Sequence, residues 1–339
     1  MTEIALRPQA LPAALTFERT VARAHAHRRA LGEVFVSDSV ADGDSTFYAA
    51  VQIPRAHSLW YDRTTVYHDP FAMAEAARQG SFVVLHRHVG VPVGLPFSML
   101  RYEFEVTDRA AFLDDEKSPL EGVLRYDIVS RTDRGADFAD LTLEGELSVG
   151  GRSAMRLGAD VVFLARADYE ALRAYQQSRK SEADPGQPVL SPLPPERVGR
   201  MDSRNIVIAE PADEGARWVY PLLPDPRHPA LFDHEYDHVP GPFIIEAFRQ
   251  AAIDTAVRSG GLTSPITTVV SCSSRFDQFG EFGAPLECVC TPVDPTRPDT
   301  ARVDVELRQF DRVLTTGTLE LASIAEFASS FVHRVRAES

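Results

Sequence analysis

The chain has 339 residues, of which 44% are hydrophobic, and a formal net charge of −14. This length predicts about two domains with packed cores, and no stretch approaches the ~20 apolar residues of a membrane span. The acidic balance argues against nucleic acid as a partner. Three cysteines without paired spacing, and an N-terminus without the features of a secretion signal, indicate a cytoplasmic protein with no membrane partner.

The first half of the chain predicts two strands, a loop, one long helix and then several strands. The first two strands fall at 33–37 and 47–53, and a loop over 57–70 leads into a helix over 71–88. Four more strand-like runs follow, with Val149-Gly150-Gly151-Arg152 as a hairpin turn between the last two: 97–106, 122–130, 139–147 and 153–164. Because strands and helices do not alternate regularly, this pattern indicates an α+β domain.

The second half repeats this order after a linker. A short surface helix is expected over 168–180, followed by a proline-rich segment. The second long helix is predicted over 241–259, and the last two strands turn at Phe310-Asp311-Arg312. We therefore expect an N-terminal domain at 17–168, a linker at 169–197 and a C-terminal domain at 198–330.

The two predicted long helices carry the same polar set, Glu-x-x-Arg-Gln, in an apolar background. Its members are Glu75, Arg78 and Gln79 in the first helix and Glu246, Arg249 and Gln250 in the second. The two glutamates are 171 positions apart, and at this offset Phe35-Val36 falls on Ile206-Val207. A match of this length indicates an internal duplication of one fold.

The polar set of each helix is expected to face an enclosed site. A helix that is apolar on all sides is typically surrounded by other structure, and residues three or four apart share one face. Charged groups in such a place are costly unless they are paired or used. A structural salt bridge within each helix is the alternative, and we favour the functional interpretation because the set occurs in both halves.

The loops before the two helices contribute further candidates. Asp62 and Asp233 occupy matched positions, as do His57 and His228, and either the site or loop-stabilising hydrogen bonds would explain them. His238 precedes the second helix where Tyr67 precedes the first, which suggests that the second half is the more catalytic one.

Two other patterns are given structural interpretations. For the segment with His25 and His27, a metal or phosphate role is the alternative, and a solvated basic surface is expected. Cys288 and Cys290 alternate on a strand and point the same way, but two thiols make a poor zinc site, so we expect packing and no metal.

At the level of whole motifs, the chain is similar to a known family from about residue 33 to 321. Asp237-His238-Val239-Pro240-Gly241 leading into Glu246-Ala247-Phe248-Arg249-Gln250 resembles the A-factor biosynthesis family of γ-butyrolactone (butenolide) synthases. Tyr67-His68-Asp69-Pro70 leading into Glu75-Ala76-Ala77-Arg78-Gln79 looks like the first-half signature of that family. The resemblance implies a double hotdog fold, in which each of two tandem repeats has a long central helix wrapped by an antiparallel sheet.

The resemblance also implies an activity. A β-ketoacyl group on acyl carrier protein would be transferred to dihydroxyacetone phosphate, and the ester would close by aldol condensation and lose water to give a butenolide phosphate. The implied catalytic residues are Glu75, Glu246 and Arg249. The substrate-binding candidates are Arg78, Gln79, His238, Gly241 and Gln250. We expect no metal or redox cofactor, and a monomer whose halves pack as a pseudo-dimer.

The residue chemistry is compatible with acyl transfer. An enclosed carboxylate is expected to have a raised pKa, which would suit Glu246 as general base, with Glu75 sharing proton transfer. The N–H groups of Gly241 and Phe243 at the helix start are expected to polarise the thioester carbonyl. Arg249 is expected either to anchor the phosphate or to hold Glu246.

Two alternatives stay open at this level. One is a hotdog dehydratase or thioesterase that acts on thioesters of acyl carrier protein or coenzyme A. The other is a non-catalytic module that binds an acyl ligand.

Overall fold

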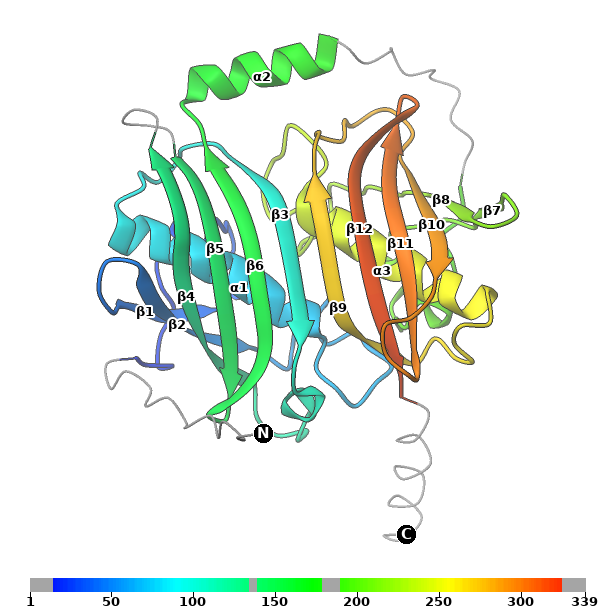
Figure 1. The fold of residues 1–339 in the computed structure, drawn as a ribbon, viewed down its shortest axis with the longest axis horizontal. Helices are drawn as coiled ribbons and strands as arrows, with labels where there is room; N and C mark the ends of the chain where they lie inside the picture. The colour runs from blue at the N-terminus through cyan, green and yellow to red at the C-terminus, as the bar shows by residue number, and fades with distance from the viewer. Residues whose placement is uncertain (1–14, 134–138, 179–189, 325–339) are drawn as a thin grey trace, which may run out of the picture.

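A single antiparallel sheet of twelve strands forms one layer of the molecule, and two long helices lie against one of its faces (Figure 1). The computed structural model describes residues 15–133, 139–178 and 190–324. The first-half strands are β1 (Val36–Ala41), β2 (Thr46–Ile53), β3 (Phe97–Val106), β4 (Leu120–Asp133), β5 (Ala139–Val149) and β6 (Arg152–Phe163). The second-half strands are β7 (Ala212–Asp213), β8 (Trp218–Pro221), β9 (Thr267–Phe276), β10 (Glu287–Val293), β11 (Thr300–Gln309) and β12 (Arg312–Ser323).

The strand order shows that the two halves are copies of one another. Outward from the middle, the first half runs β3-β6-β5-β4-β2-β1 and the second runs β9-β12-β11-β10-β8-β7. The halves join where β3 pairs antiparallel with β9, with Tyr102 opposite Ser274. This arrangement confirms the predicted α+β double hotdog, with its halves packed as a pseudo-dimer.

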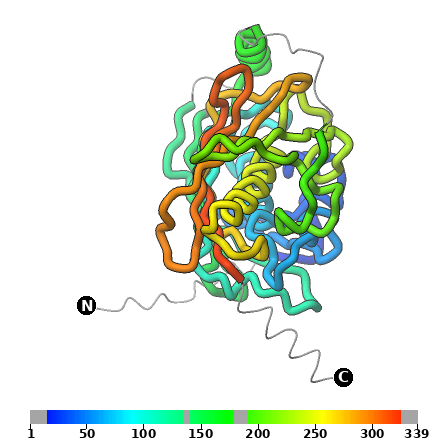
Figure 2. The backbone as a smooth tube through the Cα atoms, turned by 90° about the vertical axis from the view of Figure 1, so that its right-hand side faces the viewer, coloured from blue at the N-terminus to red at the C-terminus, as the bar shows by residue number. Residues whose placement is uncertain are grey.

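The two long helices are almost completely enclosed, as their composition predicts. Helix α1 (Pro70–Val84) begins after Asp69, whose side chain accepts a hydrogen bond from the Phe71 N–H, and continues into a π-helical turn, η2 (Leu85–Val89). Helix α3 (Gly241–Arg258) begins after Pro240 without a side-chain cap. In the view turned by 90°, α3 lies against the sheet (Figure 2). None of the helices in the described ranges is both long and apolar enough to cross a membrane.

The beginning of each copy differs from the prediction. The first strand starts at Val36 rather than at residue 33, and the matching outer strands of the second half, β7 and β8, are short. The Phe35 N–H donates to Gln79 and the Val207 N–H donates to Gln250, so Phe35 corresponds to Val207 and not to Ile206. The ungapped repeat is therefore wrong by one residue at this point.

Helix α2 (Arg166–Ser178) follows the first half and lies apart from α1 and α3, at one end of the molecule (Figure 1). It confirms the predicted surface helix, beginning two residues earlier than residue 168. Most of the proline-rich segment and the chain after residue 324 lie outside the described residues. The Cys288 and Cys290 thiols are fully buried 3.6 Å apart, so of the core or surface packing expected for them the structure shows core packing.

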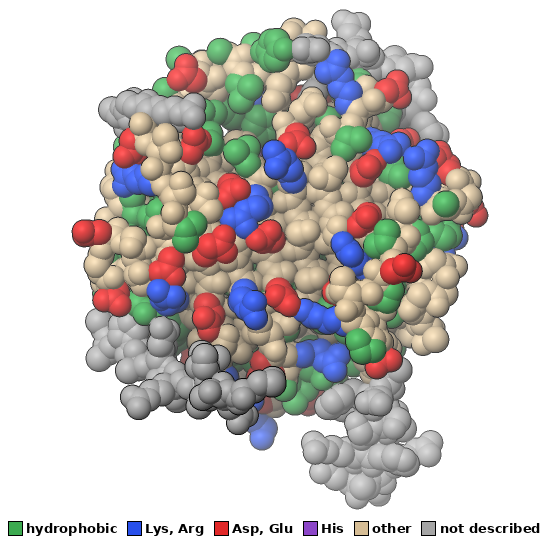
Figure 3. Space-filling view, in the orientation of Figure 1, with side chains coloured by type: hydrophobic (Ala, Val, Ile, Leu, Met, Phe, Trp, Pro, Cys, Tyr) green, Lys and Arg blue, Asp and Glu red, His purple; other side chains and the backbone are tan. Residues whose placement is uncertain are grey.

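The sheet face that points away from the long helices carries mixed charges (Figure 3). On it, Arg101 of β3 donates to Asp160 of β6 at 3.1 Å and to Glu144 of β5 at 2.9 Å. Side chains alternate between the two faces of a strand, so the opposite face is left to the apolar residues that pack on α1 and α3. The core and any enclosed site therefore lie on the helix side.

Close packing of α1 on β4 predicts that an added methyl group will destabilise the protein. A Cβ at Gly80 would overlap the Tyr126 hydroxyl, which donates to the Ala77 carbonyl at 2.8 Å. We expect Gly80→Ala to lower the free energy of unfolding by about 1–3 kcal/mol, despite the better helix propensity of alanine. Denaturant unfolding measures this change.

The matched control is Gly32→Ala, because no atom lies within 4 Å of a Cβ at that position. Adding Tyr126→Phe to Gly80→Ala should recover part of the loss by removing the overlapping oxygen. A Gly80→Ala protein as stable as the parent would contradict this account of the packing.

Candidate active site

The first buried cluster surrounds Glu75 on α1. Arg78 donates to its carboxylate through Nε at 2.8 Å and Nη2 at 2.9 Å, and Gln79 donates through Nε2 at 2.9 Å. Arg28, which precedes β1, forms a further ion pair with Glu75. One carboxylate is therefore held by two guanidinium groups and an amide.

The second cluster repeats this arrangement around Glu246 on α3. Arg249 donates to the carboxylate through two nitrogens at 2.9 Å, and Gln250 donates at 2.6 Å. Arg200 adds two more bonds, from Nη2 at 2.8 Å and from Nε at 3.1 Å. The Glu-Arg-Gln sets thus have the same geometry in both halves.

Arg28 and Arg200 are members of the clusters that sequence reasoning missed. The segment around His27 was expected to be solvated, but the Arg28 side chain is only 2% exposed. The missed signal is the repeat itself. With the one-residue shift that aligns Phe35 with Val207, Arg28 falls on Arg200.

The segments that carry Arg28 and Arg200 are each held by hydrogen bonds to an aspartate of the other half. Asp233 accepts hydrogen bonds from the backbone N–H groups of Arg29 and Ala30, at 2.6 and 3.1 Å. In the same way, Asp62 accepts from the Met201 N–H at 2.7 Å and from the Asn205 side chain at 2.7 Å. Both aspartates therefore stabilise loops, one of the two roles considered for them, and they do so across the boundary between the halves.

The two histidines at matched positions are also loop residues. His57 Nε2 lies 3.3 Å from a Glu33 carboxylate oxygen, and His228 Nε2 lies 2.9 Å from the Asn205 side-chain oxygen. Their Nδ1 atoms accept backbone N–H groups of the following turn. Their contacts tie each helix-entry loop to the segment of the same half that carries Arg28 or Arg200.

Both glutamates are ionised, contrary to the expectation of a raised pKa. Burial opposes ionisation of Glu75, but the charges of Arg28 and Arg78 outweigh it and lower the pKa to about 2. Burial likewise opposes ionisation of Glu246, and Arg200 with Arg249 lowers its pKa to about 2. A second guanidinium in each cluster, which the sequence did not reveal, reverses the predicted shift.

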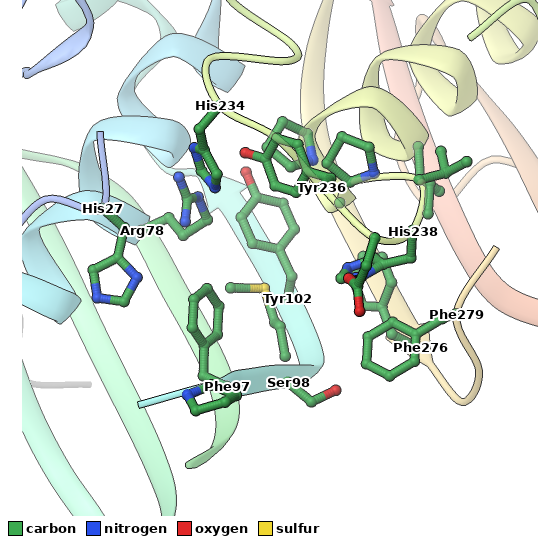
Figure 4. Close-up of a pocket in the computed structure, with 18 of the residues that line it drawn as sticks. His27, Arg78, Phe97, Ser98, Tyr102, His234, Tyr236, His238, Phe276 and Phe279 are labelled. Atoms are coloured by element: carbon green, nitrogen blue, oxygen red, sulfur yellow. The ribbon is translucent and has the colours of Figure 1, made fainter. Parts of the chain in front are cut away.

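One large cavity, of about 1180 Å³, opens beside the first cluster. Arg28, Glu75 and Arg78 all line it, whereas the second cluster contributes only Glu246. Figure 4 shows the aromatic wall of this cavity. Phe97 and Tyr102 come from β3, Tyr236 comes from the loop before α3, and Phe276 and Phe279 come from the end of β9 and the residues after it.

The two arginines that sequence reasoning missed differ in how their donors are used. All three side-chain nitrogens of Arg200 donate hydrogen bonds. Nε and Nη2 donate to Glu246, and Nη1 donates to the carbonyls of Leu59 at 2.7 Å and Asp62 at 2.5 Å. Arg28 uses Nη2 for Glu75, while its buried Nε and Nη1 have no hydrogen-bond partner among the described residues. The clusters are therefore alike in composition but not in saturation.

The second half contributes the helix start that faces the cavity. Gly241 lines it, and α3 has no capping side chain, whereas Asp69 caps α1. The Phe243 N–H donates to the Pro240 carbonyl at 3.1 Å, so its expected role with a thioester carbonyl is wrong. The Gly241 N–H has no such bond among the described residues.

The predicted site residues fall into two groups. Glu75, Arg78, His238, Gly241 and Glu246 line the one cavity. Gln79, Arg249 and Gln250 lie behind the cavity. The side-chain amides of Gln79 and Gln250 each accept one backbone hydrogen bond and donate another. Gln79 accepts from the Phe35 N–H and donates to the Glu33 carbonyl, and Gln250 does the same with Val207 and Asn205.

His238 has a partner of its own at the cavity. Its Nδ1 lies 2.6 Å from an Asp237 carboxylate oxygen, and its ring packs on Phe279 with centroids 4.4 Å apart. Within the described residues, no three His, Cys, Asp or Glu side chains are arranged to hold a metal ion.

The fold and the cavity define a double-hotdog protein in which residues of both duplicated halves line a shared charged pocket. The sequence profile of the A-factor biosynthesis hotdog domain matches residues 10–164 and 181–325. The chain therefore belongs to the A-factor biosynthesis family.

Similar proteins include two synthases from actinobacteria. A 2-oxo-3-(phosphooxy)propyl 3-oxoalkanoate synthase of Streptomyces virginiae is 29% identical, covering 91% of this chain and 99% of the relative. A protein of the same name from Streptomyces griseus is 28% identical, covering 76% of this chain and 81% of the relative. Among solved structures, a putative thioesterase of Novosphingobium aromaticivorans is 15% identical with a TM-score of 0.47, covering 84% of this chain and 97% of that one.

The charge state of the clusters predicts how stability depends on pH. The pKa of Glu246 in the folded protein, about 2, is below its ordinary value of 4.5, so its ion pairs stabilise the protein above pH 4.5 and are lost as the pH falls towards 2. We expect Glu246→Gln to cost about 3–5 kcal/mol at neutral pH, because two buried arginines lose their counter-ion. The difference in unfolding free energy between parent and variant should shrink across that acid window.

Denaturant unfolding at a series of pH values measures this difference, with Glu235→Gln as an exposed control that should follow the parent. A constant difference between the Glu246→Gln protein and the parent across the window would contradict an ionised Glu246.

Proposed function

We propose that the protein transfers a 3-oxoacyl group from acyl carrier protein to the free hydroxyl of dihydroxyacetone phosphate. The ester formed is a 2-oxo-3-(phosphooxy)propyl 3-oxoalkanoate, the compound in the names of its relatives. In a second stage, the carbon between the two acyl carbonyls attacks the ketone of the triose, and loss of water gives a butenolide phosphate. This product would be a precursor of a γ-butyrolactone-type signal.

The proposal rests on the surroundings of the Arg28 guanidinium. A buried guanidinium with two unused donors at a cavity wall favours an anionic ligand, and its forked geometry suits a phosphate. The charge balance agrees, because two arginines surround one carboxylate in the first cluster. In the second cluster, Asp69 lies 3.9 Å from Arg200 and supplies more negative charge.

The equivalent of Asp69 in the second half is Pro240, which cannot supply that charge. The first cluster therefore keeps an excess positive charge beside an open cavity. We assign the phosphate to this place, and this differs from the expected anchor, Arg249, which lies behind the cavity. Arg249 then holds Glu246, the second of the two roles considered for it.

The rest of the cavity suits an acyl chain. Away from the clusters its lining is largely apolar, with Phe97 and Met99 of β3, Leu172 of α2 and Phe276 of β9. Pockets of roughly 300–1,000 Å³ hold drug-sized ligands, so about 1180 Å³ accommodates a triose phosphate together with an acyl chain. The exposed arginines Arg23 and Arg29 also line the cavity. Although this protein is acidic as a whole, these two side chains provide a cationic contact for the acidic carrier protein.

We assign the ionised glutamates positioning roles. Glu75 holds Arg28 and Arg78 in place, and Glu246 with Arg249 fixes α3, whose first N–H at Gly241 would stabilise the oxyanion of the thioester carbonyl. Removing Glu75, Glu246 or Arg249 is therefore expected to abolish turnover by disordering the site.

Mass spectrometry of the products tests the function. The protein is mixed with 3-oxoacyl carrier protein and dihydroxyacetone phosphate, and we expect the phosphorylated ester or its dehydrated butenolide. Free 3-oxo acid formed equally well without the triose phosphate would instead identify a thioesterase. Ligand binding without any turnover would identify a binding module.

The role of Arg28 predicts a change in acceptor preference. Arg28→Gln should lower kcat/KM for dihydroxyacetone phosphate by about 100-fold, the effect of about 2–3 kcal/mol from lost charge-assisted bonds. The kcat/KM for unphosphorylated dihydroxyacetone should change much less. Arg28→Lys should fall between, because it keeps the charge and loses the fork.

The comparison of the two acceptors in each variant is the measurement, and Arg204→Gln, on an exposed side chain, is the control. An unchanged ratio of kcat/KM between the two acceptors in Arg28→Gln would contradict a phosphate site at this residue.

A further inference from the structure

We propose that His238 and Asp237 form the proton-transfer dyad of the reaction, positioned by α2. This inference rests on the proposed acyl transfer. It assigns the general base to the loop before α3 and not to the glutamates of the two long helices.

The hydrogen bond of the dyad orients the imidazole. His238 Nδ1 and Asp237 Oδ1 are 2.6 Å apart, and because a carboxylate can only accept, Nδ1 carries the proton. The lone pair is then on Nε2, which has no hydrogen-bond partner among the described residues. His238 lines the cavity and its side chain is 20% exposed, so Nε2 is accessible to a ligand (Figure 4).

Asp237 is fixed by side chains of α2. Tyr169 donates its hydroxyl to the Asp237 carboxylate at 3.0 Å, and Arg173 donates Nε to it at 3.2 Å and Nη2 to the Asp237 carbonyl at 2.8 Å. Arg173 is itself held by two bonds of 2.8 Å to Glu281, and its guanidinium lies over the Phe279 ring. The loop that carries His238 is thus tied to α2 by a buried arginine.

The glutamates are poorly suited to be the base. Each is paired with two arginines and a glutamine, and the pKa values of about 2 leave them ionised but weakly basic at neutral pH. In the first half, Tyr67 takes the place of His238 and is buried. The composition of the cavity therefore favours the second half for proton transfer.

Two other histidines line the cavity, but their surroundings differ. The Nε2 of His27 lies 2.6 Å from the Nε2 of His86, and burial lowers the His27 pKa to about 3. His234 packs on Tyr236 with ring centroids 4.1 Å apart, and burial lowers its pKa. His234 Nδ1 lies 3.5 Å from an Asp233 carboxylate oxygen, which is a longer contact than the 2.6 Å between His238 and Asp237 and so would stabilise an imidazolium less.

The step balances without another reactant. His238 Nε2 takes the proton of the acceptor hydroxyl, while the oxygen of that hydroxyl forms a bond to the thioester carbon. The C–S bond then breaks, its electron pair leaves with the carrier thiolate, and the imidazolium returns the proton to that sulfur. Asp237 stays ionised throughout and stabilises the transient imidazolium, and its hydrogen bond with His238 keeps the Asp237 pKa well below its usual range.

The titratable and charged groups around His238 come from three segments. They are Tyr236 and Asp237 on its own loop, Tyr169 and Arg173 on α2, and Asp277 and Glu281 after β9. Arg173, the cation of this set, forms ion pairs with both Glu281 and Asp237.

The test measures release of the carrier thiol and formation of the ester across pH for the full chain and its variants. His238→Gln should lower kcat by about 10²–10⁴-fold with little change in KM for the acceptor. It should also lose the fall in rate on the acid side that protonation of the imidazole causes. Asp237→Asn should lower kcat as well, because the ring loses its orienting carboxylate.

Arg173→Met tests positioning, and we expect a smaller loss of kcat together with a displaced acid limb of the pH profile. His88→Gln, whose ring bonds Ser39 outside the cavity, is the control and should match the parent. Circular dichroism and thermal unfolding show whether each variant is folded. A folded His238→Gln protein with parental kcat and pH profile would overturn the dyad.

The same assay separates this inference from the proposed function. Thiol release by the parent without ester formation would refute dihydroxyacetone phosphate as acceptor, while the dependence of that release on His238 would still support the dyad. A parent that releases no thiol from 3-oxoacyl carrier protein would overturn both.

Discussion

The burial of a carboxylate between two guanidinium groups is the constraint on which this structure depends. Glu75 and Glu246 are each removed from water on an apolar helix, and isolated charges in such places would be prohibitively costly. One arginine of each cluster comes from the same helix turn, but the other must arrive from the segment before the first strand of that half. The N-terminal segment of each half is therefore drawn into the centre of the molecule.

The duplicated clusters have diverged in what surrounds them. Around Glu246, all three side-chain nitrogens of Arg200 donate hydrogen bonds, Nε and Nη2 to the Glu246 carboxylate and Nη1 to two backbone carbonyls, and Asp69 adds a second negative charge 3.9 Å away. Around Glu75, the buried Nε and Nη1 of Arg28 have no hydrogen-bond partner among the described residues, and Pro240 stands where the other half has the aspartate. The open pocket is consequently composite, with Arg28 and Arg78 from the first half and the helix start with His238 from the second. The expectation of a more catalytic second half stays a prediction, because residues of both halves line the pocket.

Sequence reasoning recovered the features that local pattern determines. The apolar helices, the strand alternation and the two Glu-Arg-Gln sets follow from periodicities of a few residues, and α1, α3 and β3 appear where they were predicted. The second arginine of each cluster did not follow, because Arg28 is 47 residues from Glu75 and no local periodicity links them. The pKa direction failed for the same reason, since its sign depends on how many cations converge. The blocked Phe243 N–H likewise depends on a backbone turn at Pro240.

The exchange of Asp62 and Asp233 between the halves has a consequence for how this chain can change. A substitution at Asp62, in the first copy, disturbs the segment of the arginine that neutralises the glutamate of the second copy. A substitution at Asp233, in the second copy, likewise disturbs the arginine segment of the first copy. Neither copy can change its sequence independently of the other, and neither can be moved into another protein alone. The two copies therefore constrain each other's sequences through these loop contacts.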